Sequence, residues 1–390
     1  MAWKFLQNRT FPIGIEVGIS GVRMLQLRLG RAGWHVIAAA GHDYEVPLPE
    51  DNLTERTRII SDAVRLAKSQ ASFEGTDCIS CLSTSDMLFR AARLPKMADS
   101  ELDKAAAWEA ADRFNMEVDD LQTIWIRAGE VTQGNESRDE VILVSVPKNL
   151  VCSHLDALIE NRLRPIAVDT SFAAVTRATC RTLRRSSDLS TVQMIIDIGP
   201  KMSSVILTRG NQFAFLKTIP VGGHHLNTAV AKALNMSEAE AMEIRRRRMQ
   251  PSENHAEPSD RRVDRAIFEA VRPYMHDLAQ EASLCLRYYS VTFRGARPNG
   301  VKITGLDAAE PNLSSVIAEH LKLPTEIAKP FDGIDISKTN LGGDRRSSCH
   351  SDWTTTLGLT LRGQDGTLIG GRSRRPDQPL VQTTERRDAA

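Results

Sequence analysis

Residues 13–28, IGIEVGISGVRMLQLR, carry a pattern that returns 181 residues further on as residues 194–208, MIIDIGPKMSSVILT. Each copy reads as an apolar strand, an acidic residue, a turn with glycine and a second apolar strand. A third strand follows each copy after a further glycine-containing turn, at residues 30–33 and at residues 210–211. The repetition predicts two related lobes.

The turn after the first strand of each copy combines a carboxylate with a glycine. Glu16 and Gly18 stand there in the first copy, and Asp197 and Gly199 in the second. Because glycine lacks a Cβ atom, backbone amides can approach an anion at such a turn while the carboxylate faces a metal ion. One such turn is usually only a turn, but two copies at domain-scale separation predict a nucleotide-gripping cleft between the lobes.

The composition is that of a globular protein. Of 390 residues, 41% are hydrophobic and 25% are charged, which argues against a chain disordered throughout. The net charge of +1 gives no global field to hold nucleic acid or an acidic membrane surface. No apolar run approaches the roughly 18 residues that span a bilayer, and the N-terminus lacks a secretory signal pattern, so we expect a cytoplasmic location.

Other residues that could carry chemistry are assigned structural roles. Six cysteines without repeated spacing indicate reduced thiols. Cys78 and Cys81 form a single CxxC in an alternating apolar stretch, and we expect buried thiols of a strand because zinc needs four ligands. The arginines at 245–248 are expected at a solvated helix end. His224 and His225 lack a third metal-ligating neighbour and are assigned to turn structure.

Local patterns predict several further elements. Residues 54–70 and 100–114 show helical apolar spacing, and Ser100 is the expected cap of the second helix. Residues 237–240, SEAE, read as a capping box that opens another helix. Residues 249–261 should form a surface loop, and Pro273 should limit the following helix to a body at about residues 274–289.

The paired hairpins resemble the phosphate 1 and phosphate 2 loops of the actin, Hsp70 and sugar-kinase superfamily. Three segments narrow the resemblance to the PilM family, a relative of FtsA. Residues 219–234, IPVGGHHLNTAVAKAL, are similar to the Gly-Gly turn and first helix of subdomain 2B. Residues 301–309, VKITGLDAA, occupy the place of the adenosine loop, and residues 353–362, WTTTLGLTLR, resemble the closing helix. The resemblance covers about residues 11–362.

The resemblance implies an α/β fold of the actin-like (ribonuclease H-like) type, with duplicated lobes and an inserted 1C-type subdomain that replaces actin's 1B. The expected boundaries are residues 1–90 for the first part of subdomain 1A, 91–167 for 1C, 168–190 for a 1A helix, 191–223 for the first part of 2A, 224–272 for 2B, 273–335 for the second part of 2A, 336–362 for a loop and the closing helix, and 363–390 for a disordered tail.

The resemblance also implies a nucleotide site, with ATP between the lobes and Mg²⁺ held by Glu16 and Asp197, but no catalytic residue. The residues expected around the nucleotide are Gly18, Ser20, Gly21, Arg23, Asp197, Gly199, Ser203 and Gly305. Two positions depart from the family pattern: Glu16 replaces the usual Asp, and Leu306 follows Gly305 where a second glycine is usual. Because of these departures, the alternative that the two lobes kept their fold but lost the nucleotide stays open. We expect weak ATPase activity at most.

By the same resemblance the chain is expected to be a cytoplasmic scaffold of type IV pilus assembly. Its partner would be the N-terminal cytoplasmic peptide of a PilN-like inner-membrane protein, bound between 1A and 1C. Membrane association would occur only through that partner, no nucleic acid is expected, and homo-oligomer formation stays open. The alternatives are an active ATPase or kinase of the superfamily, or a scaffold of a GspL-like secretion system or FtsA-like division machine.

Overall fold

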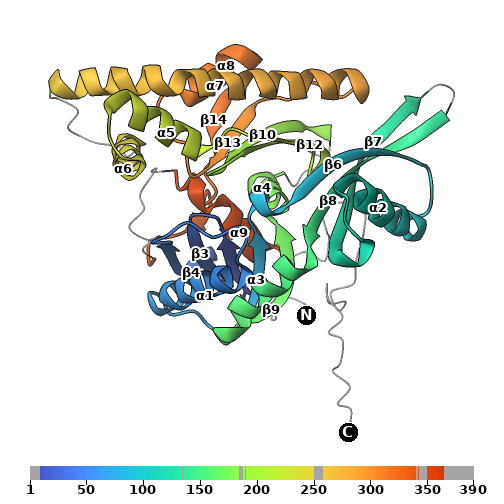
Figure 1. The fold of residues 1–390 in the computed structure, drawn as a ribbon, viewed down its shortest axis with the longest axis horizontal. Coiled ribbons are helices and arrows are strands. Elements are labelled where there is room, and N and C mark those ends of the chain that lie inside the picture. Colours follow the sequence, from blue (N-terminus) through green and yellow to red (C-terminus); the bar gives the residue numbers. More distant parts are fainter. Residues whose placement is uncertain are drawn as a thin grey trace, which may run out of the picture.

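The computed structural model describes residues 9–133, 136–183, 188, 190–249, 258–339, 341 and 349–363. Among these residues, two large sheets with helices on both faces form the body, and a small sheet with its own helix projects to one side (Figure 1). We call them the N-terminal sheet, the C-terminal sheet and the small sheet. The expected tail at 363–390 lies outside the described residues apart from Gly363.

The N-terminal sheet has the strand order β15-β4-β3-β2-β5-β9, with β1 paired along β3. Strand β3 pairs antiparallel with both β2 and β4, whereas β15 pairs in parallel with β4, β2 with β5, and β5 with β9. The strands are β1 Arg9–Thr10, β2 Ile13–Val17, β3 Gly21–Gly30, β4 Gly33–Asp43, β5 Asp77–Leu82, β9 Arg164–Thr170 and β15 Ile334–Asp335.

The C-terminal sheet repeats this arrangement in the order β12-β11-β10-β13-β14. Here too an antiparallel run, β10, β11 and β12, is followed by parallel pairing of β10 with β13 and of β13 with β14. The strands are β10 Val192–Ile198, β11 Ser203–Arg209, β12 Gln212–Ile219, β13 Val301–Gly305 and β14 Thr325–Ile327. The predicted duplication is confirmed, with β2 and β10 at equivalent central positions.

Helices α4 and α9 lie between the two large sheets, and the other large helices cover the outer faces (Figure 1). Apolar residues of α1 and α3 pack on the N-terminal sheet, and those of α5, α7 and α8 on the C-terminal sheet. The helices are α1 Leu53–Ser69, α3 Lys148–Glu160, α4 Ser171–Cys180, α5 Gly223–Leu234, α6 Glu238–Met249, α7 Pro258–Thr292, α8 Leu313–Leu321 and α9 Thr354–Leu361. Helix α9 corresponds to the expected closing helix.

Glycine allows the two central helices to cross closely. A Cβ atom built on Gly358 of α9 would lie 1.9 Å from the backbone oxygen of Ala174 in α4. On its other side α9 packs on β2, where a Cβ on Gly14 would lie 2.5 Å from the backbone oxygen of Thr356. These contacts fix α9 against both α4 and the strand that carries Glu16.

The small sheet has the order β6-β8-β7 and is covered by α2. Its elements are β6 Leu88–Pro95, α2 Asp99–Phe114, β7 Leu121–Gln133 and β8 Glu136–Pro147. The range 91–167 expected for the insertion is longer than the small sheet and its helix. It also includes α3 and most of β9, which pack with the N-terminal sheet. The expectation that Ser100 caps α2 is wrong, because Ala98 holds the cap position and no side chain caps the helix.

One apolar core joins all of these sheets around α4. Phe172 of α4 packs between Phe89 of β6 and Phe213 of β12, with ring centroids 5.9 and 5.5 Å away. The same cluster contains residues from β5, β7 and β8 on one side and from β10 and β11 on the other. The small sheet is thus packed against the C-terminal sheet as well as the N-terminal one.

Helix α7 differs from the sequence prediction. It starts at Pro258 and continues through Pro273 to Thr292, so the expected stop at Pro273 and the expected end of the loop at residue 261 are both wrong. Pro273 lies on the exposed face, whereas Val271 and Met275 are buried in the core of the C-terminal sheet. Burial on both sides of the proline outweighs the one hydrogen bond that it removes. Residues 250–257 of the expected loop lie outside the described part.

Two smaller predictions are confirmed. Cys78 and Cys81 are buried in β5, where burial raises the pKa of Cys78 to about 12 and that of Cys81 well above its usual value. At the start of α6 the Ser237 backbone N–H donates to Glu240 at 2.9 Å, and the Glu240 N–H donates to the Ser237 hydroxyl at 3.3 Å. Within the described part, no helix combines the length and apolar character needed to cross a membrane.

Candidate functional site: the cleft between the large sheets

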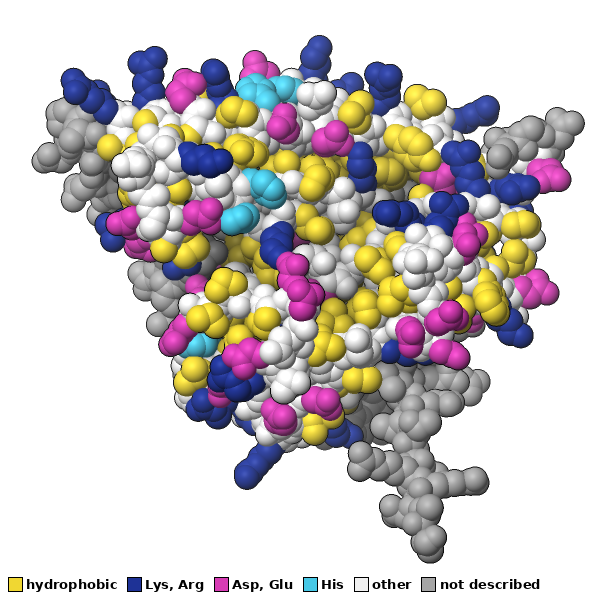
Figure 2. All heavy atoms as spheres, in the orientation of Figure 1, with side chains coloured by type: hydrophobic (Ala, Val, Ile, Leu, Met, Phe, Trp, Pro, Cys, Tyr) yellow, Lys and Arg dark blue, Asp and Glu magenta, His cyan; other side chains and the backbone are white. Residues whose placement is uncertain are grey.

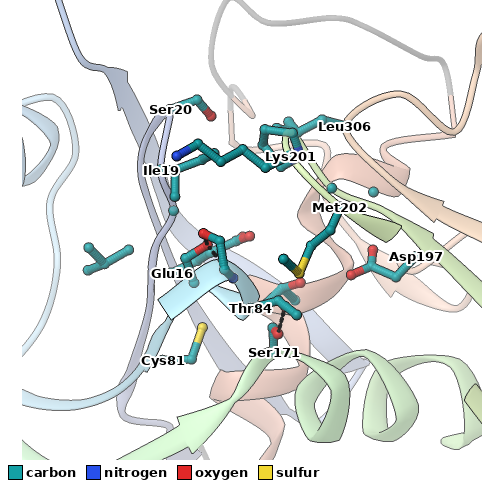
Figure 3. A pocket seen from close by; sticks show the side chains of 18 of the residues that line it. Glu16, Ile19, Ser20, Cys81, Thr84, Ser171, Asp197, Lys201, Met202 and Leu306 are labelled. Carbon is teal, nitrogen blue, oxygen red and sulfur yellow. Dashed lines mark hydrogen bonds between the residues drawn. The ribbon is translucent and has the colours of Figure 1, made fainter. Parts of the chain in front are cut away.

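The two repeated hairpins face each other across a cavity of about 60 Å³ (Figure 3). Glu16 lies near the end of β2, in register with Arg23 of β3 and Cys81 of β5. Asp197 lies near the end of β10, in register with Ser204 of β11. Because β2 and β10 hold equivalent places in their sheets, the duplicated strand order brings the two carboxylates to the same cavity.

Most of the predicted nucleotide-site residues do meet at this cavity. Glu16, Gly18, Ser20, Arg23, Asp197, Gly199 and Gly305 line it. Gly21 and Ser203 are not among the lining residues. A Cβ on Gly21 would lie 2.5 Å from the backbone oxygen of His42, and the buried Ser203 hydroxyl donates to the Val221 carbonyl at 2.6 Å. Both residues therefore stabilise the hairpins and do not face the cavity.

Sequence reasoning missed several lining residues. Polar side chains come from residues 83–85, after β5, and from Ser171, at the start of α4. Thr84 and Ser171 are hydrogen-bonded at 2.6 Å (Figure 3). The run Ser83-Thr84-Ser85, directly after an apolar strand, was the available signal, since strand ends in such sheets commonly line clefts.

Large side chains from the C-terminal lobe reduce the space. Met202 and Leu306 line the cavity, and Lys201 extends across its opening toward Ile19 and Ser20 (Figure 3). The Lys201 ammonium forms an ion pair with Glu50, on the N-terminal side, at 2.7 Å. On the face shown in Figure 2, acidic and basic side chains meet midway between the two lobes. The mouth of the cavity is thus bridged by charged side chains of the chain itself.

The two carboxylates share a site but differ in their surroundings. Burial raises the pKa of Glu16, while nearby Arg23 and a hydrogen bond of 2.8 Å from Thr356 lower it. Burial also raises the pKa of Asp197, and the negative charge of Glu16 raises it further, to about 7. Asp197 is therefore partly protonated near neutral pH.

The residues as arranged do not fit a magnesium nucleotide. A cavity of about 60 Å³ is far below the roughly 300–1,000 Å³ of small-molecule sites. The amides of Gly18 and Gly199 already donate inside their own hairpins, to Gly21 at 2.9 Å and Met202 at 3.1 Å. Among the described residues no third His, Cys, Asp or Glu joins Glu16 and Asp197 as a possible metal ligand, so Mg²⁺ held here would need waters and phosphate oxygens as its other ligands.

The segment expected to contact adenosine is bound to α6. Gly305 has a φ of +99°, and a Cβ there would lie 2.4 Å from the Ile198 carbonyl oxygen. The following Asp307 pairs with Arg245 at 2.7 Å. The expectation that residues 245–248 form a solvated helix end is wrong for Arg245, which is 1% exposed. A run of four arginines gives no sign of which one points inward.

Comparisons with known proteins agree with this architecture. Residues 14–364 match the family model described as "Type IV pilus assembly protein PilM". The structure of a "PilM-PilN type IV pilus biogenesis complex" superposes with a TM-score of 0.72 at 19% identity, covering 91% of this chain and 98% of that chain. The ethanolamine utilization protein EutJ from Carboxydothermus hydrogenoformans superposes with a TM-score of 0.54 at 14% identity, covering 90% and 89%. Both structural likenesses concern the fold alone.

Proposed function

The chain belongs to the type IV pilus assembly protein PilM family, and from that membership we propose that it is a scaffold that binds the N-terminal cytoplasmic peptide of a PilN-like inner-membrane protein. The fold is the expected actin-like α/β fold with duplicated lobes. The observation that carries the proposal is the family match over residues 14–364, which includes the small sheet as well as both large ones. The membrane is reached only through the partner.

The edge of β9 is the proposed docking place for the peptide. No described strand pairs with the outer edge of β9 in the N-terminal sheet. Such an edge offers backbone N–H and C=O groups to an extended peptide, and nearby apolar side chains give specificity. Ile166 of β9 is 43% exposed, and Ile159 of α3, the helix that leads into β9, is also exposed. These two side chains supply apolar surface near this edge, where the Val168 carbonyl of β9 accepts a hydrogen bond from Arg362 at 3.1 Å.

Titration with a synthetic peptide tests the proposal. The peptide covers the N-terminal cytoplasmic segment of the PilN-like protein of the same genome, and calorimetry measures its binding to the full chain. We expect saturable one-to-one binding that Ile166→Glu weakens at least tenfold. Val263→Glu on α7 is the matched control, since Val263 is exposed to a similar extent, 39%, and lies on another element. Its affinity should stay within twofold of the wild type.

Two results would count against the proposal. Absence of saturable binding to the folded wild-type chain would remove the scaffold role as stated. Steady-state phosphate release from Mg·ATP well above background, abolished by Asp197→Ala, would favour the alternative of an active ATPase. Binding that Ile166→Glu leaves unchanged would move the peptide away from β9 while keeping the scaffold role.

A further inference from the structure

A buried arginine joins three segments beside the cleft. Arg245 of α6 uses all five of its N–H groups. Its Nε and Nη2 atoms donate to Glu310 at 3.0 and 2.7 Å, and Nη2 also donates to Asp307 at 2.7 Å. Its Nη1 atom donates to the Asn227 side chain at 2.5 Å and to the Gly223 carbonyl at 3.2 Å. Its partners come from α5 and from the segment between β13 and α8.

The charges around Arg245 are paired and largely shielded from water. Glu310 has a side-chain exposure of 1%, and Asp307 of 12%. Arg248, one turn further along α6, adds a second cation, with its Nη1 atom 3.6 Å from Glu310. Arg248 also pairs with Asp264 at 2.7 Å, so two cations meet three carboxylates, and each buried charge lies beside an opposite charge that offsets the cost of burying it.

The cluster leaves no gap between α5 and the segment after β13. A Cβ atom on Gly223, at the start of α5, would lie 2.1 Å from Asp307 Oδ2. The Gly223 N–H donates in turn to the Gly199 carbonyl, in the hairpin that follows β10, at 3.0 Å. The Arg245 cluster is therefore connected directly to the turn that carries Asp197.

We propose that Arg245 takes the place of a nucleotide as the group that holds α5 and α6 against the C-terminal sheet, so that this chain keeps its cleft assembled without ATP. The proposal explains why Leu306 is tolerated where the family pattern has a second glycine, and it gives the following Asp307 a role. Asp307 serves as a ligand of Arg245, and Leu306 fills space at the cavity. A scaffold of this kind holds its partner without a nucleotide cycle.

The nucleotide half of the proposal is tested on the full chain with Mg·ATP. Calorimetric titration to about 1 mM should give no saturable heat, and the melting temperature should shift by less than about 0.5 °C, since a ligand that binds only the folded state raises it. Saturable binding that Asp197→Ala abolishes would overturn the proposal. Peptide affinity measured with and without Mg·ATP should agree within twofold. If the peptide does not bind at all, the proposed scaffold role is contradicted, but the result of the Mg·ATP titration remains valid.

The arginine half is tested by Arg245→Lys, with Arg247→Lys on the same helix as matched control. Lysine keeps the positive charge, but its compact ammonium group cannot reach all of the acceptors that the broad, planar guanidinium of Arg245 contacts. We expect Arg245→Lys to lower the melting temperature by at least about 5 °C and Arg247→Lys, whose side chain is 74% exposed, to change it by less than about 1 °C. Equal effects would overturn the proposal.

A milder variant keeps the test valid if Arg245→Lys does not fold. Asn227→Ala removes one acceptor of the guanidinium and leaves both carboxylates in place. Its melting temperature should fall by about 1–3 °C, and Mg·ATP should not restore it. Restoration by Mg·ATP would show that the nucleotide and the arginine cluster stabilise the same contacts, which contradicts a nucleotide-independent cleft.

Discussion

Glu16 and Asp197 occupy equivalent places in the two lobes, yet their environments differ. Arg23 and the Thr356 hydroxyl stabilise the charged form of Glu16, whereas the charge of Glu16 itself opposes ionisation of Asp197. Burial and the negative charge of Glu16 both disfavour the charged form of Asp197.

The raised pKa of Asp197 predicts a pH-dependent stability. Its carboxyl binds a proton more tightly in the folded chain, where the pKa is about 7, than in the unfolded chain, where the pKa has its ordinary value of 3.8. The folded state therefore loses stability as pH rises from about 4 to about 7. Between pH 4 and pH 8, the free energy of unfolding of the wild type should fall by about 4 kcal/mol relative to that of Asp197→Asn. Urea unfolding of both proteins at several pH values measures this difference, and parallel pH curves would contradict it.

Helix α9 depends on glycine where it crosses α4. A Cβ on Gly358 would overlap the Ala174 backbone, which cannot move without shifting α4 from the shared core. We expect Gly358→Ala to lower the free energy of unfolding by about 3 kcal/mol or more, at the upper end of overpacking costs. Gly41→Ala in β4 is the control, because its nearest neighbour would lie 3.5 Å away. Chemical denaturation should show a change of less than about 1 kcal/mol for the control.

In helix α7, replacing a proline should increase the stability of the fold, whereas replacing Gly358 should decrease it. Pro273 stands on the exposed face of a helix that continues on both sides. Alanine there would restore a backbone N–H donor and remove the clash of the ring with the preceding turn. Pro273→Ala should raise the free energy of unfolding by about 1 kcal/mol or more, measured by thermal or urea unfolding. A loss of stability would mean that the helix is bent at this point to fit the sheet.

The elements also show where sequence reasoning succeeds and where it fails. The acidic-glycine turns at Glu16 and Asp197 were predictable because strand pattern and turn chemistry are local and occur twice. Pro273 misled the prediction because burial of Val271 and Met275 is a tertiary effect. Arg245 was indistinguishable from its neighbours, since its role depends on acids more than 60 positions away, at Asp307 and Glu310. Contacts across the fold decide such cases, and one sequence does not display them.

The whole molecule behaves, on this packing, as one unit. The core around Phe172 contains residues from the N-terminal sheet, the small sheet and the C-terminal sheet. Charged bridges add little to this union. Lys201 with Glu50, and Arg246 with Asp43 at 3.3 Å, join the lobes at exposed positions, where an ion pair contributes about 0–1 kcal/mol. Apolar packing around α4 therefore stabilises the union of the lobes more than these ion pairs do.

Calorimetry should therefore show a single cooperative unfolding transition for the described body. Phe172→Ala should lower the free energy of unfolding by about 3–5 kcal/mol, as expected for a fully buried aromatic side chain. The same variant should loosen the small sheet and the C-terminal sheet together, which hydrogen exchange of β8 and β11 can report. Independent melting of the small sheet in the wild type would contradict a shared core.

The shared core has a mechanical consequence. A protein anchored in the membrane and gripping the edge of β9 would exert tension on the N-terminal sheet, next to the small sheet. Phe172 of α4 contacts Phe89 of the small sheet and Phe213 of the C-terminal sheet edge to face. Through these contacts such a load would reach the C-terminal sheet by way of packed side chains. Tension applied at β9 would therefore act on the N-terminal sheet, the small sheet and the C-terminal sheet together.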